Sequence, residues 1–362
     1  MVWAMLLATI CGLLGAAEPL EDLFRGGRNM IRARPADQKV VVVGLDERTY
    51  DRFGTLAFSR KYDAALIRSL VAMGAHHIYF DRTYTEKTTP EGDDALISAL
   101  RSTPGKVSLG VMISNDKVRS QSIIMAPAPE FQTVSQMASL NGLNRPFSLS
   151  ADLHYAMTFQ GGTIPSVSAD IAKYKGTPNT YYRPDWSIQM TTIPTFSMID
   201  ILDGKVEASQ IRGKDVLFGM TTARAPDFHG IAGQGWLPGV YFHAVGAQTL
   251  REGHPANWGW LPALFLAFAC SLLLLRCKTR AGAGLVTTLS IAVLIAVPFL
   301  LDIRFITADF MPAYLLFGIV AYRSMMLREV NRAQRLHAGT LLPNLSALRE
   351  VPQAAQLPLV AM

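Results

Sequence analysis

The C-terminal third of this 362-residue chain is dominated by apolar sequence, and this feature limits the folds open to it. The apolar residues form three long segments, at 258–275, 281–301 and 305–322. An α-helix needs about 20 apolar residues to cross the hydrocarbon core of a bilayer, and each segment is close to that length. The sequence therefore predicts three transmembrane helices.

The three segments differ in how well they suit a membrane. Trp258 and Trp260 open the first, as tryptophans commonly do at a membrane–water interface. The second contains no charged residue. The third is the weakest, because Asp309 and Pro312 lie near its start. A carboxylate at the bilayer centre costs about 3 kcal/mol, so we expect Asp309 at the level of the lipid headgroups.

Cationic residues around these segments predict their orientation, because short cytoplasmic loops carry an excess of Lys and Arg. The loop after the first segment and the sequence after the third are rich in cations: Arg276, Lys278, Arg280, Arg323, Arg328, Arg332 and Arg335. The loop between the second and third segments has only Arg304. Both cation-rich sites are therefore expected in the cytoplasm, which places residues 18–257 outside.

Residues 1–17 form a further apolar run, which is either a membrane anchor or a signal peptide. The small residues at 15–17 would suit cleavage, but no basic residue precedes the run. We expect an uncleaved transmembrane anchor, in a chain whose natural start lies further upstream. Four cations follow it on the side that we place outside, against the positive-inside rule: Arg25, Arg28, Arg32 and Arg34.

The net charge of +6 belongs to the membrane flanks. Residues 18–257 hold 25 Lys/Arg against 24 Asp/Glu, and the remainder holds 9 against 4. No basic patch with interleaved aromatic residues is present in the sequence, so we expect no nucleic-acid partner. The cysteines, Cys11, Cys270 and Cys277, fall in or beside apolar segments, which leaves the outer region without a disulfide or a Cys-based metal site.

The outer region alternates strand and helix patterns. Short β-branched or apolar runs predict strands at 39–46, 77–81, 106–112 and 215–218. Helical spacing predicts a helix at 59–75, begun by Ser59 and ended by Gly74, and others at 93–101 and 238–253. Residues 114–196 are rich in Pro, Ser, Thr and Gly and give no regular pattern. We predict the α/β fold class: an extracytoplasmic domain with a mainly parallel sheet and right-handed crossovers, plus transmembrane α-helices.

The order of these pieces resembles a known family. The stretches that carry the resemblance are VVVVGLDERTYDRFG, MGAHHIYFD, DDALISAL, IRGKDVLFGMTT and LPGVYFHAV, followed by three membrane segments. Over most of 39–322 the chain resembles the second type of CHASE domain, an extracytoplasmic sensor of bacterial signalling receptors. The tryptophan-rich segment usual before the first helix is TLAFSR here. The resemblance implies a receptor in the bacterial inner membrane, with its sensor in the periplasm or outside and its C-terminus in the cytoplasm.

The stretch AGTLLPNLSALRE, at 338–350, is similar to the start of a GGDEF diguanylate cyclase domain, which reads Leu-Thr-Gly-Leu-Pro-Asn. Some residues agree and others depart from this motif; the departures are His337, Gly339, Leu341 and Leu345. The similarity implies a cytoplasmic linker helix and the remnant of a cyclic-di-GMP synthase over 323–362. The signature loop, metal carboxylates and GTP-binding residues of such a domain do not occur in the sequence, so we expect no enzymatic activity unless the gene continues.

Ligands of parallel α/β sheets bind beyond the carboxyl ends of the strands. Asp46, Asp81 and Thr221 follow predicted strands at that end, and His243 lies in the last predicted helix of the outer region. Arg60, next to the expected Ser59 cap, could pair with an anion or with a carboxylate such as Asp46. These five residues are candidate contacts of an unidentified extracytoplasmic ligand. Asp46, Asp81 and His243 each have a purely structural alternative, because Asp commonly caps turns and a buried His commonly bonds to the backbone.

An outer enzyme is the competing hypothesis, either a hydrolase facing the periplasm or a metal-dependent enzyme. Several residues have side chains of a type that could hold a divalent ion: His76, His77, Asp81, Asp227 and His229. Their spacing matches no metal motif such as HExxH, and the sequence has no Gly-x-Ser-x-Gly elbow. We therefore expect no metal, no other cofactor and no catalytic residue.

Cyclases of this kind act as pairs, so the resemblance implies a homodimer. Met326, Val330 and Ala333 recur at intervals of four and three residues, as on the contact face of paired helices. The sequence therefore predicts a helical seam after the third membrane segment. The expected partners are the lipid bilayer, the ligand and a second copy of the chain.

Overall fold

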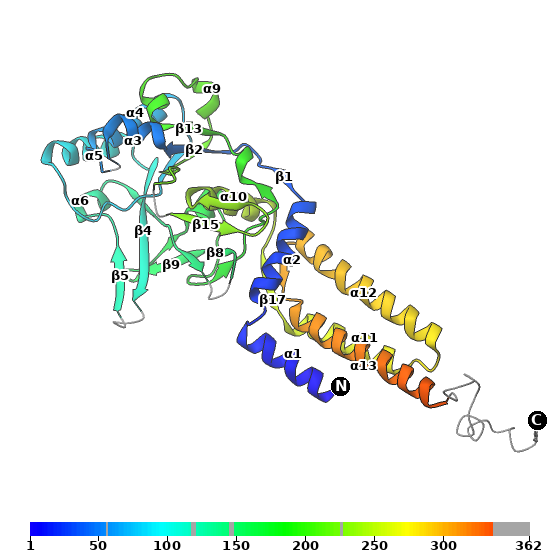
Figure 1. Ribbon diagram of the computed structural model, residues 1–362. Coiled ribbons are helices and arrows are strands. Elements are labelled where there is room, and N and C mark those ends of the chain that lie inside the picture. The colour runs from blue at the N-terminus through cyan, green and yellow to red at the C-terminus, as the bar shows by residue number, and fades with distance from the viewer. Residues whose placement is uncertain (56, 117–120, 145–147, 225–226, 336–362) are drawn as a thin grey trace, which may run out of the picture. The chain divides into compact units, whose positions relative to one another are not determined.

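The structure is a computed structural model, and it describes residues 1–362 except 56, 117–120, 145–147, 225–226 and 336–362 (Figure 1). The chain divides into two compact units, each described by itself. The α/β unit comprises Glu18–Asn257 and Leu301–Thr307. The helical unit comprises Met1–Ala17, Trp258–Leu300 and the described residues from Ala308 onward. The AGTLLPN stretch, predicted to begin a cyclase domain, lies outside the described residues.

The centre of the α/β unit is a seven-stranded sheet. Its path runs β13-β2-β14-β3-β4-β5, and β6 pairs with β4. Every pair in it is parallel except β4 with β5, which confirms the prediction of a mainly parallel sheet. The strands are β2 (Val40–Leu45), β3 (His77–Phe80), β4 (Val107–Asp116), β5 (Gln121–Met125), β6 (Gln136–Ser139), β13 (Thr195–Ser197) and β14 (Asp215–Met220).

The sequence of strand β2 shows why this sheet is buried on both faces. Its sequence VVVVGL is buried at every position, as expected of a parallel strand covered on both faces. Because side chains alternate across a strand, Val40 and Val42 join one apolar cluster and Val41 and Val43 the other. Two separate cores therefore lie on the two faces of one sheet.

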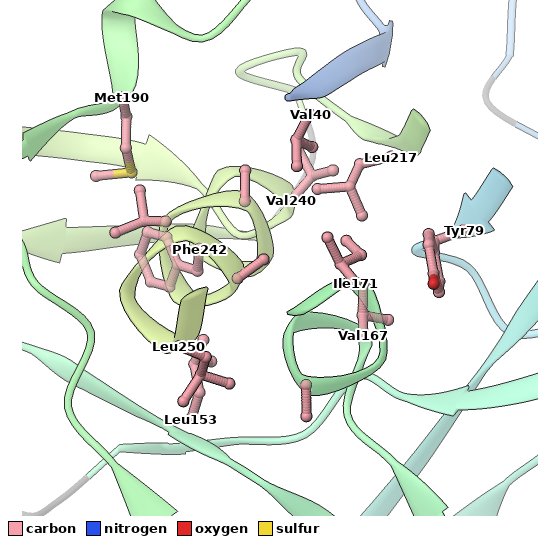
Figure 2. Packing of buried hydrophobic residues seen from close by; sticks show 14 of the residues in the cluster. Val40, Tyr79, Leu153, Val167, Ile171, Met190, Leu217, Val240, Phe242 and Leu250 are labelled. Atoms are coloured by element: carbon pink, nitrogen blue, oxygen red, sulfur yellow. The ribbon is translucent and has the colours of Figure 1, made fainter. Parts of the chain in front are cut away.

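Helices cover both faces. Apolar residues of α4 (Lys61–Ala72), α5 (Pro90–Ser102) and α8 (Met198–Leu202) pack in the cluster with Val41. Those of α7 (Val167–Ala172) and α10 (Val240–Glu252) pack in the cluster with Val40. Figure 2 shows part of this second cluster, where Val40 and Leu217 of the sheet lie near Ile171 of α7. Each face of the sheet is thus buried by its own helices.

The helices predicted from the sequence exist, with shifted ends. Helix α4 has Arg60 at its N-cap position, not Ser59, and no side-chain cap bond. Helix α5 starts earlier than predicted, because the Thr89 hydroxyl accepts a hydrogen bond from Gly92 N and Pro90 fills the first turn. Helix α10 begins at Val240, since Pro238 ends strand β16 (Gly235–Pro238).

Residues 114–196, which gave no sequence pattern, contain several short strands beside the main sheet. Three of them form a small sheet in the order β11-β8-β7, two form the hairpin β9-β10, and β1 pairs with β12. Their bounds are β7 (Gly142–Asn144), β8 (Ala151–His154), β9 (Ala156–Phe159), β10 (Gly162–Pro165), β11 (Tyr181–Tyr182) and β12 (Ile188–Gln189), whereas β1 (Arg34–Pro35) lies earlier in the chain. Such two- to four-residue strands are too short to show an apolar period.

The remaining elements of the α/β unit are short, apart from the long helix α2. They are α2 (Glu18–Ile31), α3 (Glu47–Phe53), α6 (Pro129–Gln132), the 3-10 turn η1 (Met190–Thr192), α9 (Ala208–Ile211) and β15 (Phe228–Ile231). Strand β15 pairs with β16 as an antiparallel hairpin. This hairpin lies directly before α10 in the chain.

The helical unit contains α1 (Val2–Leu14), α11 (Leu261–Arg276), α12 (Arg280–Ile303, up to Leu300 in this unit) and α13 (Met311–Arg335). Strands β17 (Ala256–Gly259) and β18 (Ile306–Ala308) pair just before α11 and α13. The third membrane segment was predicted at 305–322, but its helix starts at Met311. Residues Ile306–Ala308 extend as a strand, and Pro312 falls in the first helical turn, where its missing N–H costs nothing.

By length and composition, one described helix can cross a membrane, and it is α12. Helices α1 and α2 would add a second only if they formed one interrupted span, and α11 is apolar but shorter. The fold class is therefore a mixed α/β structure with helices at each predicted membrane segment. The number of transmembrane segments stays a prediction.

Candidate functional site

A cavity of about 540 Å³ opens at the carboxyl edge of the main sheet, and we call it the sheet-edge cavity. Its walls come from the ends of β3 and β14, the start of α10, the β15–β16 hairpin and the small sheet of β7 and β8. Its polar lining is Asp81, Arg82, Thr83, Asp227, His229 and His243, and its apolar lining includes Met112, Leu140, Leu153, Met220 and Phe242. This is where parallel α/β sheets commonly bind ligands.

The backbone fixes Asp81 at this edge. Asp81 follows the last residue of β3, and its N–H donates to the Phe218 carbonyl of β14 at 2.8 Å. Its side chain lines the cavity and is 10% exposed. Burial, together with the nearby carboxylate of Asp227, raises the pKa of Asp81 from 3.8 to about 7. A carboxyl group that is half protonated near neutral pH is unusual and marks candidate functional sites.

His243 faces Asp81 from the first turn of α10. Its Nε2 lies 3.9 Å from Asp81 Oδ1, which is too long for a hydrogen bond. The ring is buried, and its Nδ1 has no hydrogen-bond partner among the described residues. Burial lowers the pKa of His243 to about 4, so the ring is neutral at physiological pH. Asp81 and His243 thus lie close together in the interior without a hydrogen bond between them.

Asp227 and His229 form a second pair on the hairpin wall. His229 Nε2 lies 3.1 Å from Asp227 Oδ1, and the backbone N–H of Gly239 donates to the Asp227 carbonyl at 3.0 Å. A Cβ at position 239 would lie 2.7 Å from Asp227 Oδ2. Glycine at the start of α10 therefore lets the Asp227 carboxylate approach the helix.

Arg82 is the cation in the cavity wall, and its charge is already matched. Its Nη1 lies 3.2 Å from Oδ1 of Asp63, which is fully buried. Its guanidinium also stacks over Phe58 at 5.2 Å and over Tyr84 at 5.6 Å from the ring centroids. Besides Arg82, the ionisable groups of the lining are therefore the carboxyl groups of Asp81 and Asp227 and the two histidines, and His229 lies beside Asp227.

The other three predicted site residues lie elsewhere. Asp46 caps α3, with its Oδ1 accepting from Thr49 N at 3.0 Å and from Ser197 Oγ at 3.0 Å. Arg60 pairs with Asp93 at 2.6 Å, so the suggested Asp46 pairing is wrong. Thr221 packs against β2, where a Cβ on Gly44 would clash with its Oγ1. The structural alternatives describe Asp46 and Arg60, and of the five candidates only Asp81 and His243 line the cavity.

The residues considered as metal ligands do not lie together in the structure. His77 begins β3 and bonds to Ser108 Oγ at 2.8 Å, whereas Asp81 follows the other end of the strand. A strand rises about 3.3 Å per residue, so the two lie too far apart to share an ion. His76, next to His77, pairs with Asp215 at 2.7 Å. Within the described part of the chain, no three His, Cys, Asp or Glu residues form a group that could hold a metal.

Asp227, His229 and Arg82 were not predicted as ligand contacts. Asp227 and His229 flank the start of a short hairpin strand without a sequence period, so no pattern directs them toward β3. Arg82 directly follows Asp81 in the chain. It therefore also lies at the carboxyl end of a strand, where ligands commonly bind, and could be predicted on that ground.

A second polar group in the α/β unit surrounds α2, and we call it the α2 network. Arg183 contacts Asp22 and Asp152, each at 2.9 Å, and Asp22 also pairs with Arg25 at 3.0 Å. Further ion pairs of the network include Arg32–Asp185 at 2.9 Å, Arg34–Asp185 at 3.1 Å and Arg28–Asp302 at 2.6 Å. The arginines that run against the positive-inside rule are therefore held by carboxylates of the same unit.

A family model described as the CHASE2 domain matches residues 3–276. No curated protein and no solved structure matches the chain.

Proposed function

Because the chain belongs to the CHASE2 domain family of extracytoplasmic sensors in signalling receptors, we propose that it is a transmembrane receptor of the bacterial inner membrane. In this proposal the α/β unit lies in the periplasm or outside. It senses a ligand there, and α11, α12 and α13 relay the signal to a cytoplasmic output of the diguanylate cyclase type. The receptor itself carries out no chemical reaction and acts as a homodimer.

The observation that carries the proposal is the sheet-edge cavity. Binding cavities of proteins commonly measure about 300–1,000 Å³ and combine apolar walls with a few polar groups. At about 540 Å³, with Phe242 and Leu153 in its apolar lining and Asp81 and His243 in its polar lining, the cavity has this character. Its apolar wall is continuous with the core beneath the sheet, because Leu153 and Phe242 also belong to that cluster (Figure 2).

The α2 network supports a relay toward the membrane. The segment Leu301–Thr307, which joins α12 to α13 in the chain, belongs to the α/β unit. Asp302 in this segment pairs with Arg28 of α2, and both side chains are buried. A conformational change in the α/β unit would therefore be passed through Leu301–Thr307, which belongs to that unit, to the ends of α12 and α13.

An outer enzyme remains the competing proposal, and one observation favours it. A carboxyl group with a pKa of about 7 beside a neutral imidazole suits acid–base chemistry. Turnover of a member of a substrate panel that disappears in His243→Ala would establish the enzyme. A receptor site predicts no turnover by either the parent chain or the variant.

Reporter fusions test the receptor proposal. A phosphatase that is active only outside the cytoplasm should be active when fused after Asn257 and inactive when fused after Arg280. A reporter that works only in the cytoplasm should give the opposite pattern at the two positions. The reversed result would place the α/β unit in the cytoplasm and end the receptor proposal.

A further inference from the structure

We propose that the sheet-edge cavity binds a small organic cation, a primary amine attached to an apolar body. The inference rests on the proposed function in one respect, since it takes the cavity as the sensing site. It follows from the charges of the lining residues, from the unsatisfied polar atoms and from the apolar wall.

The charges favour a cation. Asp81 and Asp227 contribute two carboxyl groups to the lining. The only described cation there, Arg82, is paired with Asp63, and the His243 ring is neutral at physiological pH. An anion would meet two acidic groups without a free cation to bind it. An ammonium group would instead gain charge-assisted hydrogen bonds, which are stronger than neutral ones.

The unsatisfied atoms favour a donor. The Asp81 carboxyl group accepts no hydrogen bond from the described residues, and its nearest charged partner is His243 at 3.9 Å. The buried Nδ1 of His243 also lacks a partner among them. A buried polar group without a hydrogen bond is costly, so such groups usually meet water or a ligand. An ammonium carries three N–H donors and no acceptor, which matches a carboxylate.

The apolar part of the lining favours a ligand with an apolar body. Phe242, Leu140, Leu153, Met112 and Met220 line the cavity. Burying an aromatic or aliphatic group there is favourable, because it removes apolar surface from water. A simple inorganic cation would leave this wall and most of the volume unused. The cavity therefore suits an amphipathic amine.

Binding should release a proton. Below pH 7 Asp81 is largely protonated in the empty cavity, because its pKa is raised to about 7. An ammonium beside it favours the carboxylate, so Asp81 loses its O–H proton to solvent while the amine keeps its charge. No bond to carbon forms or breaks. The heat of binding near pH 6 should therefore vary with the ionisation enthalpy of the buffer.

Three indole compounds of similar shape test the charge preference in the full chain purified in detergent. Tryptamine is a cation, tryptophol is neutral and indole-3-acetate is an anion. By titration calorimetry at pH 7, tryptamine should bind at least about tenfold more tightly than either of the others, as expected for a charge-assisted bond. Equal binding, tighter binding of indole-3-acetate, or no binding of tryptamine would overturn the proposal.

Variants locate the binding in the cavity. Asp81→Asn and, separately, Asp227→Asn should weaken tryptamine binding about tenfold or more while leaving tryptophol unchanged. The matched control is Asp200→Asn, which removes a carboxylate that pairs with Arg48 at an exposed site. Tryptamine binding that both cavity variants retain at full strength would contradict the proposal.

Thermal unfolding without ligand would show that each variant is folded. The measurement uses purified protein and does not depend on topology. Failure of the amine proposal can therefore be distinguished from failure of the receptor proposal.

Discussion

Buried carboxyl groups are paired with arginines in the α2 network but not in the sheet-edge cavity. In the network, Asp22 and Asp185 each accept two arginine contacts, at 2.9 to 3.1 Å. In the cavity, the closest ionisable partner of Asp81 is a neutral histidine ring at 3.9 Å. Burial is similar, since the side chains of Asp185 and Asp81 are 6% and 10% exposed.

The two sites differ in whether the charge of a buried carboxyl group is compensated by other residues of the protein. A buried charge costs several kcal/mol unless it is paired and hydrogen-bonded. The network meets that cost within the protein, and the pairs join α2 to Arg183, Asp152 and Asp302. In the cavity no cation compensates the buried charge of Asp81, and its pKa is raised to about 7. The network therefore compensates the ionised carboxylates within the protein, and the cavity leaves the ionised form of Asp81 uncompensated.

The largest expected effect comes from breaking the network. Replacing Arg183 with Met leaves Asp152 and Asp22 with less compensation, because both are buried and each contacts Arg183 at 2.9 Å. Removing one member of a buried ion pair costs about 3–5 kcal/mol. We expect the free energy of unfolding of the full chain in detergent to fall by that amount in urea titrations followed by tryptophan fluorescence. A change below about 1 kcal/mol would show that the network is not a stabilising unit.

The next effect has the opposite sign. Asp81→Asn should stabilise the protein at pH 8, because the folded state must ionise a carboxyl whose pKa is raised to about 7 from 3.8. Stability is lost as the pH rises from 3.8 to about 7, and the variant avoids this loss. The shift corresponds to about 2–4 kcal/mol, after an allowance for the new amide. The gain should disappear below pH 4, and a destabilised variant at pH 8 would contradict the comparison.

A smaller effect belongs to His243, and it appears on the acid side. Its pKa in the folded state is about 4 against 6.5 when unfolded, so stability is lost as the pH falls from 6.5 toward 4. Ionisation of Asp81 opposes this trend, so the test is best done with Asp81→Asn already present. In the Asp81→Asn protein, His243→Gln should reduce the stability lost between pH 6.5 and pH 4 by about 1–2 kcal/mol.

The other charged groups near His243 are Asp227, His229 and Arg82, and they are the same in both proteins. His77 and His154, with pKa values also lowered to about 4, contribute loss of the same sign to both. The difference between the two proteins therefore isolates His243. Equal acid sensitivity of the two would show that the ring is not buried as described.

The smallest effect is expected at an exposed ion pair. Arg48 contacts Asp200 at 2.6 Å, but its side chain is 54% exposed. Exposed pairs contribute little, because solvent screens them and the side chains lose freedom. Arg48→Met should therefore leave the urea midpoint unchanged within error. A loss as large as that of Arg183→Met would mean that burial does not set the ranking.

The sequence predicts the central fold well for a physical reason. Strands such as β2 are buried on both faces, so their apolar runs are continuous and easy to read. The long amphipathic helices α4 and α5 carry a clear period as well. The small sheet of β7, β8 and β11 has strands of two to four residues, which hold no readable period. That part of the fold depends on tertiary packing.

The candidate site is predicted in part, for a related reason. Asp81 follows a strand whose end is visible in the sequence, and His243 lies on a helix whose apolar neighbours mark it as buried. Asp46 has the same sequence setting as Asp81, yet it caps α3 with Thr49. Whether a strand-end aspartate turns back on its own loop or into a cavity depends on what packs above it. Asp227 comes from a hairpin far along the chain, which a single sequence does not align with β3.

The central claim is that the sheet-edge cavity faces the outside of the cell, and thiol labelling tests it most directly. Thr83 lines the cavity and is partly exposed, so Thr83→Cys, in a chain with Cys11, Cys270 and Cys277 replaced, gives one thiol there. A second protein keeps Cys277 alone, at the end of α11 that we place in the cytoplasm. A membrane-impermeant maleimide applied to intact cells should label the Thr83→Cys protein and should label the Cys277 protein only after permeabilisation; the reverse pattern would contradict the account.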